Sequence, residues 1–140
     1  MEDEALTQIL RRVRHIALVG ASDKPERASY RVMAYLLVQG YRVTPISPKL
    51  AGQTLLGQRV YATLEEVTQP IDMVDVFRNA DAAYGIAQQA IAVGASVLWL
   101  QLGVINPEAS ALAQAAGLQV VMDRCPKIEI PRLGLERDEA

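Results

Sequence analysis

Short apolar runs rich in β-branched residues alternate along the chain with longer stretches in which apolar residues recur every three or four positions. The short runs predict buried β-strands and the longer stretches predict amphipathic helices. The predicted strands comprise residues 16–19, 41–46, 73–77, 97–100 and 118–122. The predicted helices comprise residues 5–14, 30–39, 80–93 and 107–116, with a helical turn at 64–67 and an irregular connection at 50–61.

The alternation of strands with helices is typical of a parallel sheet that is covered on both faces. Because crossovers between parallel strands are right-handed, we predict an α/β fold: a single Rossmann-like, doubly wound, parallel five-stranded sheet in the order 3-2-1-4-5. We expect residues 1–140 to form one domain, with a leading helix in residues 1–14 and a surface tail in residues 127–140. Ligands of such sheets bind beyond the carboxyl ends of the strands, beside the first strand.

The composition is that of a soluble globular protein, with 51% hydrophobic and 21% charged residues. A net charge of -2 gives no bulk attraction to nucleic acid or to an anionic membrane. No apolar run approaches the roughly 20 residues that a membrane helix requires. The N-terminus is acidic and Cys125 is the single cysteine. We therefore expect a cytoplasmic protein with neither a nucleic-acid nor a membrane partner.

The first predicted strand ends abruptly in small residues, and a helical pattern begins shortly afterwards, near Ser29. Gly20 can adopt backbone angles that are closed to other residues, and Ala21 and Ser22 are small enough to let a phosphate reach the backbone N–H groups. From Gly20 the chain reads Gly-Ala-Ser-Asp-Lys-Pro, where the dinucleotide fingerprint has Gly-x-Gly-x-x-Gly. The loop therefore predicts a ligand with a nucleotide phosphate but lacks the NAD motif.

The second predicted strand ends in Ser47, Pro48 and Lys49, where an NAD-binding domain usually has an acidic residue for the ribose hydroxyls. A cation at this position favours a phosphorylated ribose, as in NADP or at the 3′-phosphate of coenzyme A (CoA). Further positive charge lies near the first loop, at Lys24, Arg27 and Arg31. These cations indicate a polyanionic small ligand, although Lys24 and Arg31 are equally consistent with a solvated surface.

These segments resemble the CoA-binding domain family, over about residues 13–130. That family's fold also forms the N-terminal domain of the succinyl-CoA synthetase alpha subunit and of the ADP-forming acyl-CoA synthetases. The resemblance rests mainly on the Val-Gly-Ala-Ser and Pro-Lys motifs at their present spacing. The matching segments are residues 16–22, 43–49, 57–61, 71–78 and 94–103, and residues 117–126 resemble the small stand-alone members of the family.

The resemblance implies CoA or acyl-CoA as the ligand. The loop that matches Gly20–Ser22 holds CoA phosphates in the family, the lysine that matches Lys49 lies near the nucleotide end, and the tripeptide that matches residues 77–79 lies along the ligand. The synthetases tend to have Val-Pro-Ala there, so Arg78 is a departure that either contacts a phosphate or caps a carbonyl. The candidate binding residues are Gly20, Ala21, Ser22, Lys24, Arg27, Ser29, Pro48, Lys49, Phe77, Arg78 and Asn79.

No group of residues in the sequence predicts catalysis or a metal site, because the carboxylates are scattered. His15 lies at the start of the first strand, away from the expected ligand. Cys125 follows the fifth strand near Arg124 and Lys127 and is either a small structural residue or a thiol that forms a mixed disulfide with CoA.

Three functions are consistent with these observations. We favour a non-catalytic CoA or acyl-CoA binding protein that acts as a carrier, a sensor or a partner of an acyl-CoA enzyme. The alternatives are an enzyme, either an NADP-binding oxidoreductase domain or a remnant subunit of an acyl-CoA ligase, and an interaction domain that has lost its ligand. The resemblance counts against a ligase, because the synthetases need a second domain with a phosphorylated histidine.

Overall fold

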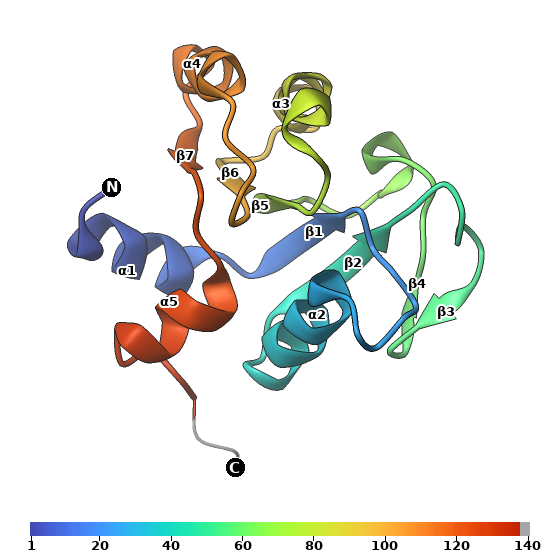
Figure 1. Ribbon diagram of the computed structural model, residues 1–140. Coiled ribbons are helices and arrows are strands. Elements are labelled where there is room, and N and C mark those ends of the chain that lie inside the picture. The colour runs from blue at the N-terminus through green and yellow to red at the C-terminus, as the bar shows by residue number, and fades with distance from the viewer. Residues whose placement is uncertain (138–140) are drawn as a thin grey trace.

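The computed structural model describes residues 1–137 and contains one five-stranded parallel sheet with helices on both faces (Figure 1). The Rossmann-like α/β class is thus confirmed. The strands of the sheet are β1 (His15–Val19), β2 (Arg42–Ile46), β5 (Met73–Val76), β6 (Val97–Leu100) and β7 (Gln119–Val121). The α-helices are α1 (Asp3–Arg12), α2 (Ala28–Val38), α3 (Ala83–Ala92), α4 (Pro107–Ala115) and α5 (Pro126–Arg132).

Each face of the sheet has its own hydrophobic core. Helices α1, α2 and α5 cover the face that carries Leu18 and Trp99, and helices α3 and α4 cover the face that carries Val74 and Leu98. Every residue of β1, β5 and β6 is buried. Apart from His15 and Asp75, these strands therefore consist of apolar residues rather than of alternating apolar and polar ones. No helix in residues 1–137 is long and apolar enough to cross a bilayer.

The strand order differs from the expected one. It is β2-β1-β5-β6-β7, so the third strand of the sheet pairs with β1, through Ile16 and Met73, instead of lying outside β2. The connection after β2 explains the difference, because Tyr61 forms a parallel bridge with Ile46 and occupies the outer edge of β2. The chain crosses to the other side of β1 instead. The reversal of strand order, where such sheets bind ligands, consequently lies between β1 and β5.

The irregular connection expected at 50–61 contains a small antiparallel hairpin, formed by β3 (Thr54–Leu55) and β4 (Gln58–Arg59). The helical turn expected at 64–67 is the 3-10 helix η1 (Leu64–Glu66). Its N-terminus has a capping box, in which the Thr63 and Glu66 side chains satisfy each other's backbone N–H groups. This connection brings Ala62 and Thr63 to the carboxyl edge of the sheet.

The prediction of a surface tail at residues 127–140 is wrong for the first part of that range. Residues 126–132 form α5, which begins with Pro126 at a favourable first position and buries Ile130 against the core. Two prolines within seven residues suppress the sequence signal for a helix, although the spacing of Pro126, Ile130 and Leu133 is helical. Residues 138–140 of the expected tail lie outside the described residues.

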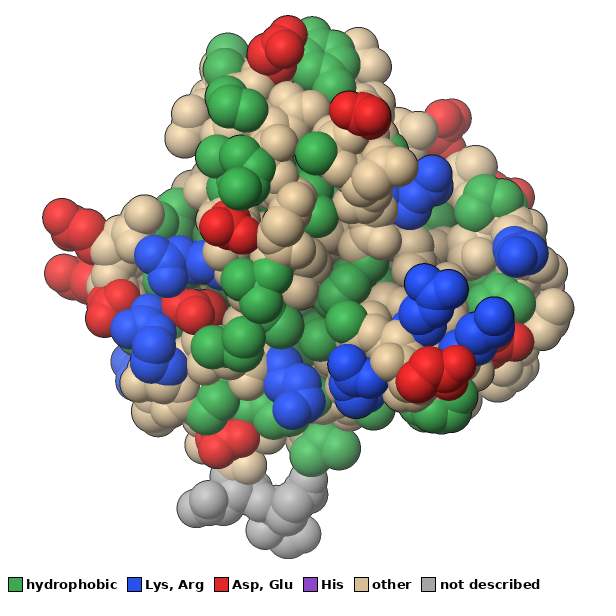
Figure 2. All heavy atoms as spheres, viewed as in Figure 1, with side chains coloured by type: hydrophobic (Ala, Val, Ile, Leu, Met, Phe, Trp, Pro, Cys, Tyr) green, Lys and Arg blue, Asp and Glu red, His purple; other side chains and the backbone are tan. Residues whose placement is uncertain are grey.

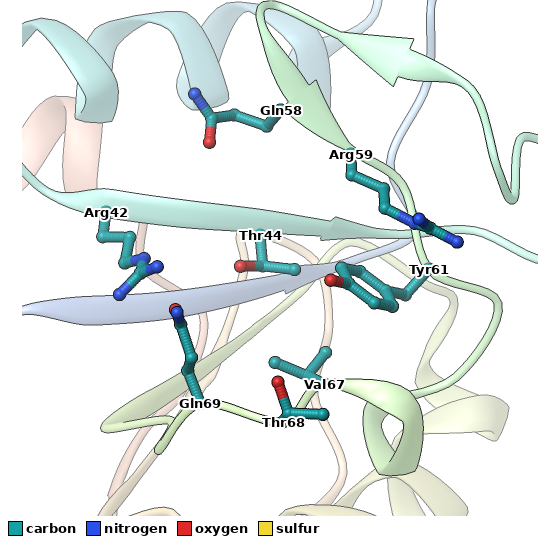
Figure 3. A pocket seen from close by; sticks show the side chains of 8 residues that line it. All are labelled: Arg42, Thr44, Gln58, Arg59, Tyr61, Val67, Thr68 and Gln69. Carbon is teal, nitrogen blue, oxygen red and sulfur yellow. The ribbon is translucent and has the colours of Figure 1, made fainter.

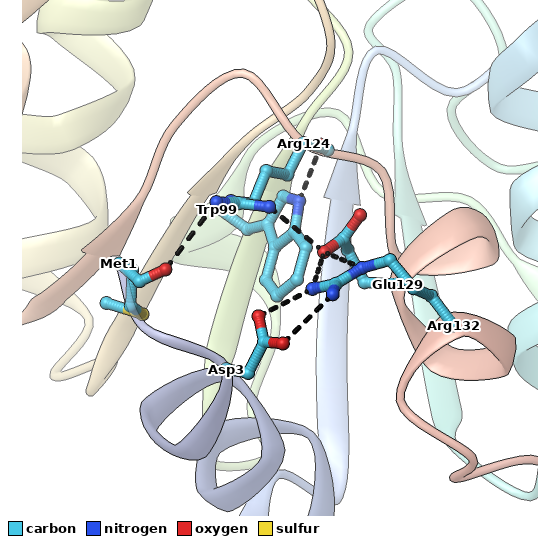
Figure 4. Close-up of polar contacts among 6 residues, drawn as sticks. All are labelled: Met1, Asp3, Trp99, Arg124, Glu129 and Arg132. Atoms are coloured by element: carbon cyan, nitrogen blue, oxygen red, sulfur yellow. Dashed lines mark hydrogen bonds and ion pairs between the residues drawn. The ribbon is translucent and has the colours of Figure 1, made fainter.

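Helices α1 and α5 are joined by an ionic network (Figure 4). Arg132 donates to both carboxylate oxygens of Asp3, at 3.0 and 2.9 Å, and to Oε1 of the buried Glu129 at 2.7 Å. Arg124 donates to the same oxygen of Glu129 at 3.1 Å. Two guanidinium groups thus compensate one buried carboxylate and attach the N-terminal helix to the C-terminal one.

Candidate functional site

A pocket of about 670 Å³ opens at the carboxyl edge of the sheet, where the strand order reverses. Its walls come from the ends of β1 and β2, the loops that follow them, residues 62–63, residues 77–78 and one face of α3. In Figure 2, Lys and Arg side chains gather on the side of the molecule where the loop after β1 runs in Figure 1. The pocket therefore lies where the fold predicts a ligand.

The loop after β1 depends on the glycine at its start. Gly20 has a φ of +94°, and a Cβ at this position would lie 2.5 Å from the carbonyl oxygen of Phe77. The backbone N–H groups of Gly20 and Ala21 both donate to the carbonyl oxygen of Ile46, at 3.1 Å each. These two N–H groups are therefore already paired within the chain, whereas the sequence-based prediction has the backbone N–H groups of this loop contact a phosphate.

The free backbone donors lie further along this loop. Within residues 1–137, the N–H groups of Ser22 and Asp23 have no hydrogen-bond partner, and Arg27, the N-cap residue of α2, provides no side-chain cap. The first turn of α2 thus also retains open N–H groups. Unpaired donors at a helix N-terminus attract anions, and these groups replace Gly20 and Ala21 as candidates for phosphate contact.

The loop after β2 is held in shape by Ser47. Its N–H donates to the carbonyl oxygen of Tyr61 at 2.9 Å, and its Oγ accepts from the N–H of Leu50 at 3.3 Å. Pro48 and Lys49 follow on the pocket wall. Lys49 forms no ion pair with any carboxylate in the described part of the chain. Its ammonium group is therefore available to an anionic ligand.

The loop after β5 places Arg78 over the first loop. The Phe77 N–H donates to the Val19 carbonyl at 2.8 Å, and Cδ of Arg78 lies 3.2 Å from the position of a Cβ on Gly20. The Arg78 guanidinium makes no hydrogen bond or ion pair within residues 1–137, so the carbonyl-capping alternative is not observed. Arg78 lines the pocket as an unpaired cation.

The structure brings together most of the candidate residues but not all. The pocket is lined by Gly20, Ala21, Ser22, Arg27, Pro48, Lys49, Phe77 and Arg78. Three candidates do not line it. Lys24 is exposed on the far side of the turn, Ser29 is buried in α2, and the Asn79 side chain accepts from the N–H of Ala82 at 3.0 Å as the cap of the 3-10 helix η2 (Ala80–Ala82).

Sequence reasoning missed the wall formed by α3. Ala82, Gly85, Ile86 and Gln89 recur at helical spacing and share the face that lines the pocket. A Cβ on Gly85 would meet nothing within 4 Å, so the glycine leaves open space there. A glycine inside an otherwise helical pattern is a signal for such a wall, although the residue types themselves carry no distinctive chemistry.

His15 and Cys125 lie outside the pocket. His15 begins β1 at the opposite end of the sheet, where Nδ1 lies 2.6 Å from the carbonyl oxygen of Pro70 and Nε2 lies 2.7 Å from Oγ1 of Thr44. Cys125 is buried in the core beside α5. These positions support structural roles for both residues.

One buried acid also lies outside the pocket. Asp75 occupies the centre of β5 between Leu18 and Trp99, and complete burial raises the pKa of its carboxyl well above the ordinary value. When the Gln101 amide is oriented with its nitrogen toward this carboxyl, the nitrogen donates at 2.9 and 3.3 Å. Burial thus favours the neutral form of this carboxyl, which is a hydrogen-bonded group of the core.

The charged side chains that line the pocket are all positive. Three cations line it, Arg27, Lys49 and Arg78, and no Asp, Glu, His or Cys among the described residues does so. Residues 1–137 also contain no group of three or more His, Cys, Asp or Glu side chains placed to hold a metal ion. The arrangement can hold a ligand with several negative charges against a partly apolar wall.

Comparison with known proteins identifies the family of this chain. The model of the CoA binding domain matches residues 14–131. The chain belongs to the CoA-binding domain family. It is 36% identical to the protein YneT of Bacillus subtilis (strain 168) over 123 residues, which are 88% of this chain and 90% of that protein.

Solved structures show the same fold. A hypothetical protein from Pyrococcus horikoshii OT3 superimposes with a TM-score of 0.91 at 42% identity, over 95% of this chain and 92% of that one. An acetyl-coenzyme A synthetase from Ca. Korarchaeum cryptofilum superimposes with a TM-score of 0.66 at 22% identity, over 76% of this chain. The match covers 25% of the synthetase and shows a shared fold.

Proposed function

We propose that this protein binds CoA or acyl-CoA without transforming it, and that the ligand occupies the pocket at the carboxyl edge of the sheet. The observation that carries the proposal is the unbalanced charge of the lining, which has three cations and no carboxylate among the described residues. CoA carries a diphosphate and a 3′-phosphate, so it matches this charge. Membership of the CoA-binding domain family supports the same ligand.

The diphosphate is assigned to the loop after β1. The free N–H groups of Ser22 and Asp23 and the open first turn of α2 provide backbone donors, and Arg27 and Arg78 provide charge from either side. Hydrogen bonds between cations and phosphate oxygens are roughly twice as strong as neutral ones. This assignment replaces Gly20 and Ala21 as direct donors but keeps their small size, which leaves room for the phosphates.

The ribose phosphate is assigned to Lys49. This lysine follows β2 at the position where an acidic residue would bind unmodified ribose hydroxyls, and it has no ion-pair partner in the described part of the chain. The apolar face of α3, including Ala82 and Ile86, then provides a surface for the uncharged parts of the ligand. Lys49 would suit the 2′-phosphate of NADP as well, so NADP is a competing ligand in the test below.

The absence of catalysis is part of the proposal. No Asp, Glu, His or Cys of residues 1–137 lines the pocket to activate its Ser, Thr or Lys side chains, whereas nucleophilic and acid–base catalysis needs such an activating group. We therefore expect a carrier, a sensor or a partner of an acyl-CoA enzyme, acting in the cytoplasm. Incubation of the purified protein with a carboxylic acid, CoA and ATP should yield no acyl-CoA.

Calorimetric titration with CoA, dephospho-CoA, NADP and NAD tests the proposal. We expect CoA to bind more tightly than dephospho-CoA by about 10- to 150-fold, which corresponds to the loss of one charge-assisted hydrogen bond of about 1.5–3 kcal/mol. Lys49→Gln should weaken CoA binding by a similar factor and remove the preference over dephospho-CoA.

Lys24→Gln is the matched control, because it removes a lysine from the same edge of the molecule but outside the pocket. It should leave the affinity for CoA unchanged. Tighter binding of NADP than of CoA would replace the proposal with the oxidoreductase alternative, and equal binding of CoA and dephospho-CoA would remove Lys49 from the site.

A further inference from the structure

A second pocket, of about 170 Å³, lies beside the amino-terminal half of β2 (Figure 3). Arg42 and Thr44 point into it, and Ile46, two residues further along, lines the first pocket. Alternate residues of a strand point to the same face, so the two pockets lie along one face of β2. Thr44 and Ile46, which line one pocket each, are about 7 Å apart along the strand. The family comparison and the proposed CoA site do not account for this second pocket.

The second pocket is rich in cations and hydrogen-bond donors. Figure 3 shows Arg42 and Gln69 at one end and Arg59 and Tyr61 at the other, with Thr44 between them. Neither arginine forms an ion pair with a carboxylate in residues 1–137, and no Asp or Glu of that range lines the pocket. The Arg59 guanidinium lies 5.4 Å from the centre of the Tyr61 ring, which restricts its position. Two unpaired guanidinium groups around a small cavity favour an oxyanion.

The Thr44 hydroxyl is fixed as a hydrogen-bond acceptor in this pocket, because a contact with His15 uses its proton. The Pro70 carbonyl oxygen, 2.6 Å from Nδ1 of His15, can only accept a hydrogen bond, so Nδ1 carries the proton in the neutral ring. Nε2 must then accept, and the Thr44 hydroxyl donates to it at 2.7 Å. Because its only proton is used in this way, Thr44 presents lone pairs to the pocket. Its oxygen points toward the space between Arg42 and Gln69 (Figure 3).

A fixed acceptor among cationic donors selects an anion that still carries a proton. We propose that the second pocket binds inorganic phosphate at the end toward which the Thr44 oxygen points, with Arg42 and Gln69 donating to the deprotonated oxygens and the P–OH group donating to Oγ1 of Thr44. Arg59, at the other end, adds positive charge to the pocket without contacting the ion. Phosphate retains at least one O–H at neutral pH, whereas sulfate has the same shape but no proton to donate. The pocket therefore distinguishes phosphate from sulfate through Thr44, and His15 acts as a positioning residue that fixes the direction of the Thr44 hydroxyl.

The test is a titration of the full chain with sodium phosphate and, in parallel, with sodium sulfate at the same ionic strength, followed by backbone amide NMR. Phosphate should shift the amide signals of Thr44, Arg59 and Gln69 and should bind at least about tenfold more tightly there than sulfate, as expected for one hydrogen bond to a charged group. Equal affinities for the two anions, or signal changes confined to Ser22, Lys49 and Arg78, would overturn the proposal.

Variants separate the selectivity from the charge. Thr44→Val should abolish the preference for phosphate over sulfate, and Thr44→Ser, which keeps the hydroxyl, should preserve it. Arg42→Gln should weaken the binding of both anions, and Arg59→Gln, which removes charge from the far end of the pocket, should weaken it less. Arg11→Gln, on the exposed side of α1, serves as the charge control. A Thr44→Val protein that folds and still prefers phosphate would exclude Thr44 as the selective group.

The phosphate titration, repeated in the presence of saturating CoA, tests whether the two pockets are independent. Phosphate should still bind beside β2 with unchanged affinity, and displacement of phosphate by CoA would show that the second pocket is part of the CoA site. If CoA does not bind at all, the titration without CoA still reports on the second pocket, because its amides are observed individually.

Discussion

At the carboxyl edge of the sheet the charged side chains that line the pocket are unpaired within residues 1–137, whereas at the amino edge Asp72 and His15 are hydrogen-bonded within the chain. At the carboxyl edge, Lys49 and Arg78 have no partner in the described part of the chain. At the amino edge, Asp72 accepts from the N–H groups of Arg14 and His15, at 3.0 and 2.9 Å, and both ring nitrogens of His15 have partners. The comparison shows that Asp72 and His15 stabilise the fold through their hydrogen bonds, whereas Lys49 and Arg78 remain open to a ligand.

The largest effect is expected from a negative charge at the carboxyl edge. Ala21→Glu places a carboxylate in the pocket, where it repels the CoA phosphates. We expect CoA affinity to fall by more than about 100-fold, which corresponds to about 2.7 kcal/mol or more. Calorimetry measures the affinity, and a thermal melt checks that the protein remains folded. Ala51→Glu adds the same charge at an exposed position nearby and should bind CoA normally.

At the amino edge, the corresponding change should affect stability and not binding. Asp72→Ala leaves two backbone N–H groups without their acceptor, so the free energy of unfolding should fall by about 1–3 kcal/mol. Urea denaturation measures this loss, and Asp72→Asn should recover part of it, because the amide oxygen can still accept. A large loss of CoA affinity in folded Asp72→Ala protein would contradict the separation of the two edges.

Between the two edges, Asp75 makes stability depend on pH. Burial raises the pKa of this carboxyl well above its ordinary value, so the folded state keeps a proton that the unfolded chain releases above about pH 4. The free energy of unfolding should therefore decrease as the pH rises from about 4 toward the raised pKa. Asp75→Asn, which is neutral throughout, should be more stable at pH 7 and should lose this part of the pH dependence in denaturation curves.

The smallest effect is expected where helices α1 and α5 meet. The hydrogen bond from Arg132 lowers the pKa of Asp3, so this contact contributes stability above the unfolded pKa of about 3.9 and loses it as the pH falls through the lowered value. Asp3→Asn, which removes this pair and leaves the contact between Arg132 and Glu129, should reduce the melting temperature slightly at pH 7 and less at acidic pH. The loss is small because both partners are exposed to solvent. An equal loss at pH 2 and pH 7 would show that the pair is not its cause.

The strands, most helices and most of the first pocket were predictable from the sequence, because each depends on local patterns. The apolar runs ending at Val19 and Ile46 specify buried strands, and the fold class then brings Ser22, Lys49 and Arg78 to one edge. The strand order was not predictable in this way. It depends on a long-range contact, in which Tyr61 covers the edge of β2.

The features of the site that the sequence did not reveal have similar physical causes. The N–H groups of Gly20 and Ala21 are occupied by the Ile46 carbonyl, which lies 26 and 25 positions away in the chain, and no local pattern reveals that pairing. Asn79 has the side chain of a ligand-binding residue but is used as a helix cap. The α3 wall has small and apolar residues that are chemically indistinct, so only the helical position of Gly85 hinted at it.

The measurement that tests the central claim most directly is a titration of the full chain with CoA, followed by backbone amide NMR. We predict that the largest shifts fall at the carboxyl edge, at Ser22, Asp23, Lys49, Arg78 and Gly85, and that the amides of His15 and Asp72 at the amino edge do not move. Shifts centred on the amino edge, or no shifts at millimolar CoA, would contradict the assignment of the pocket.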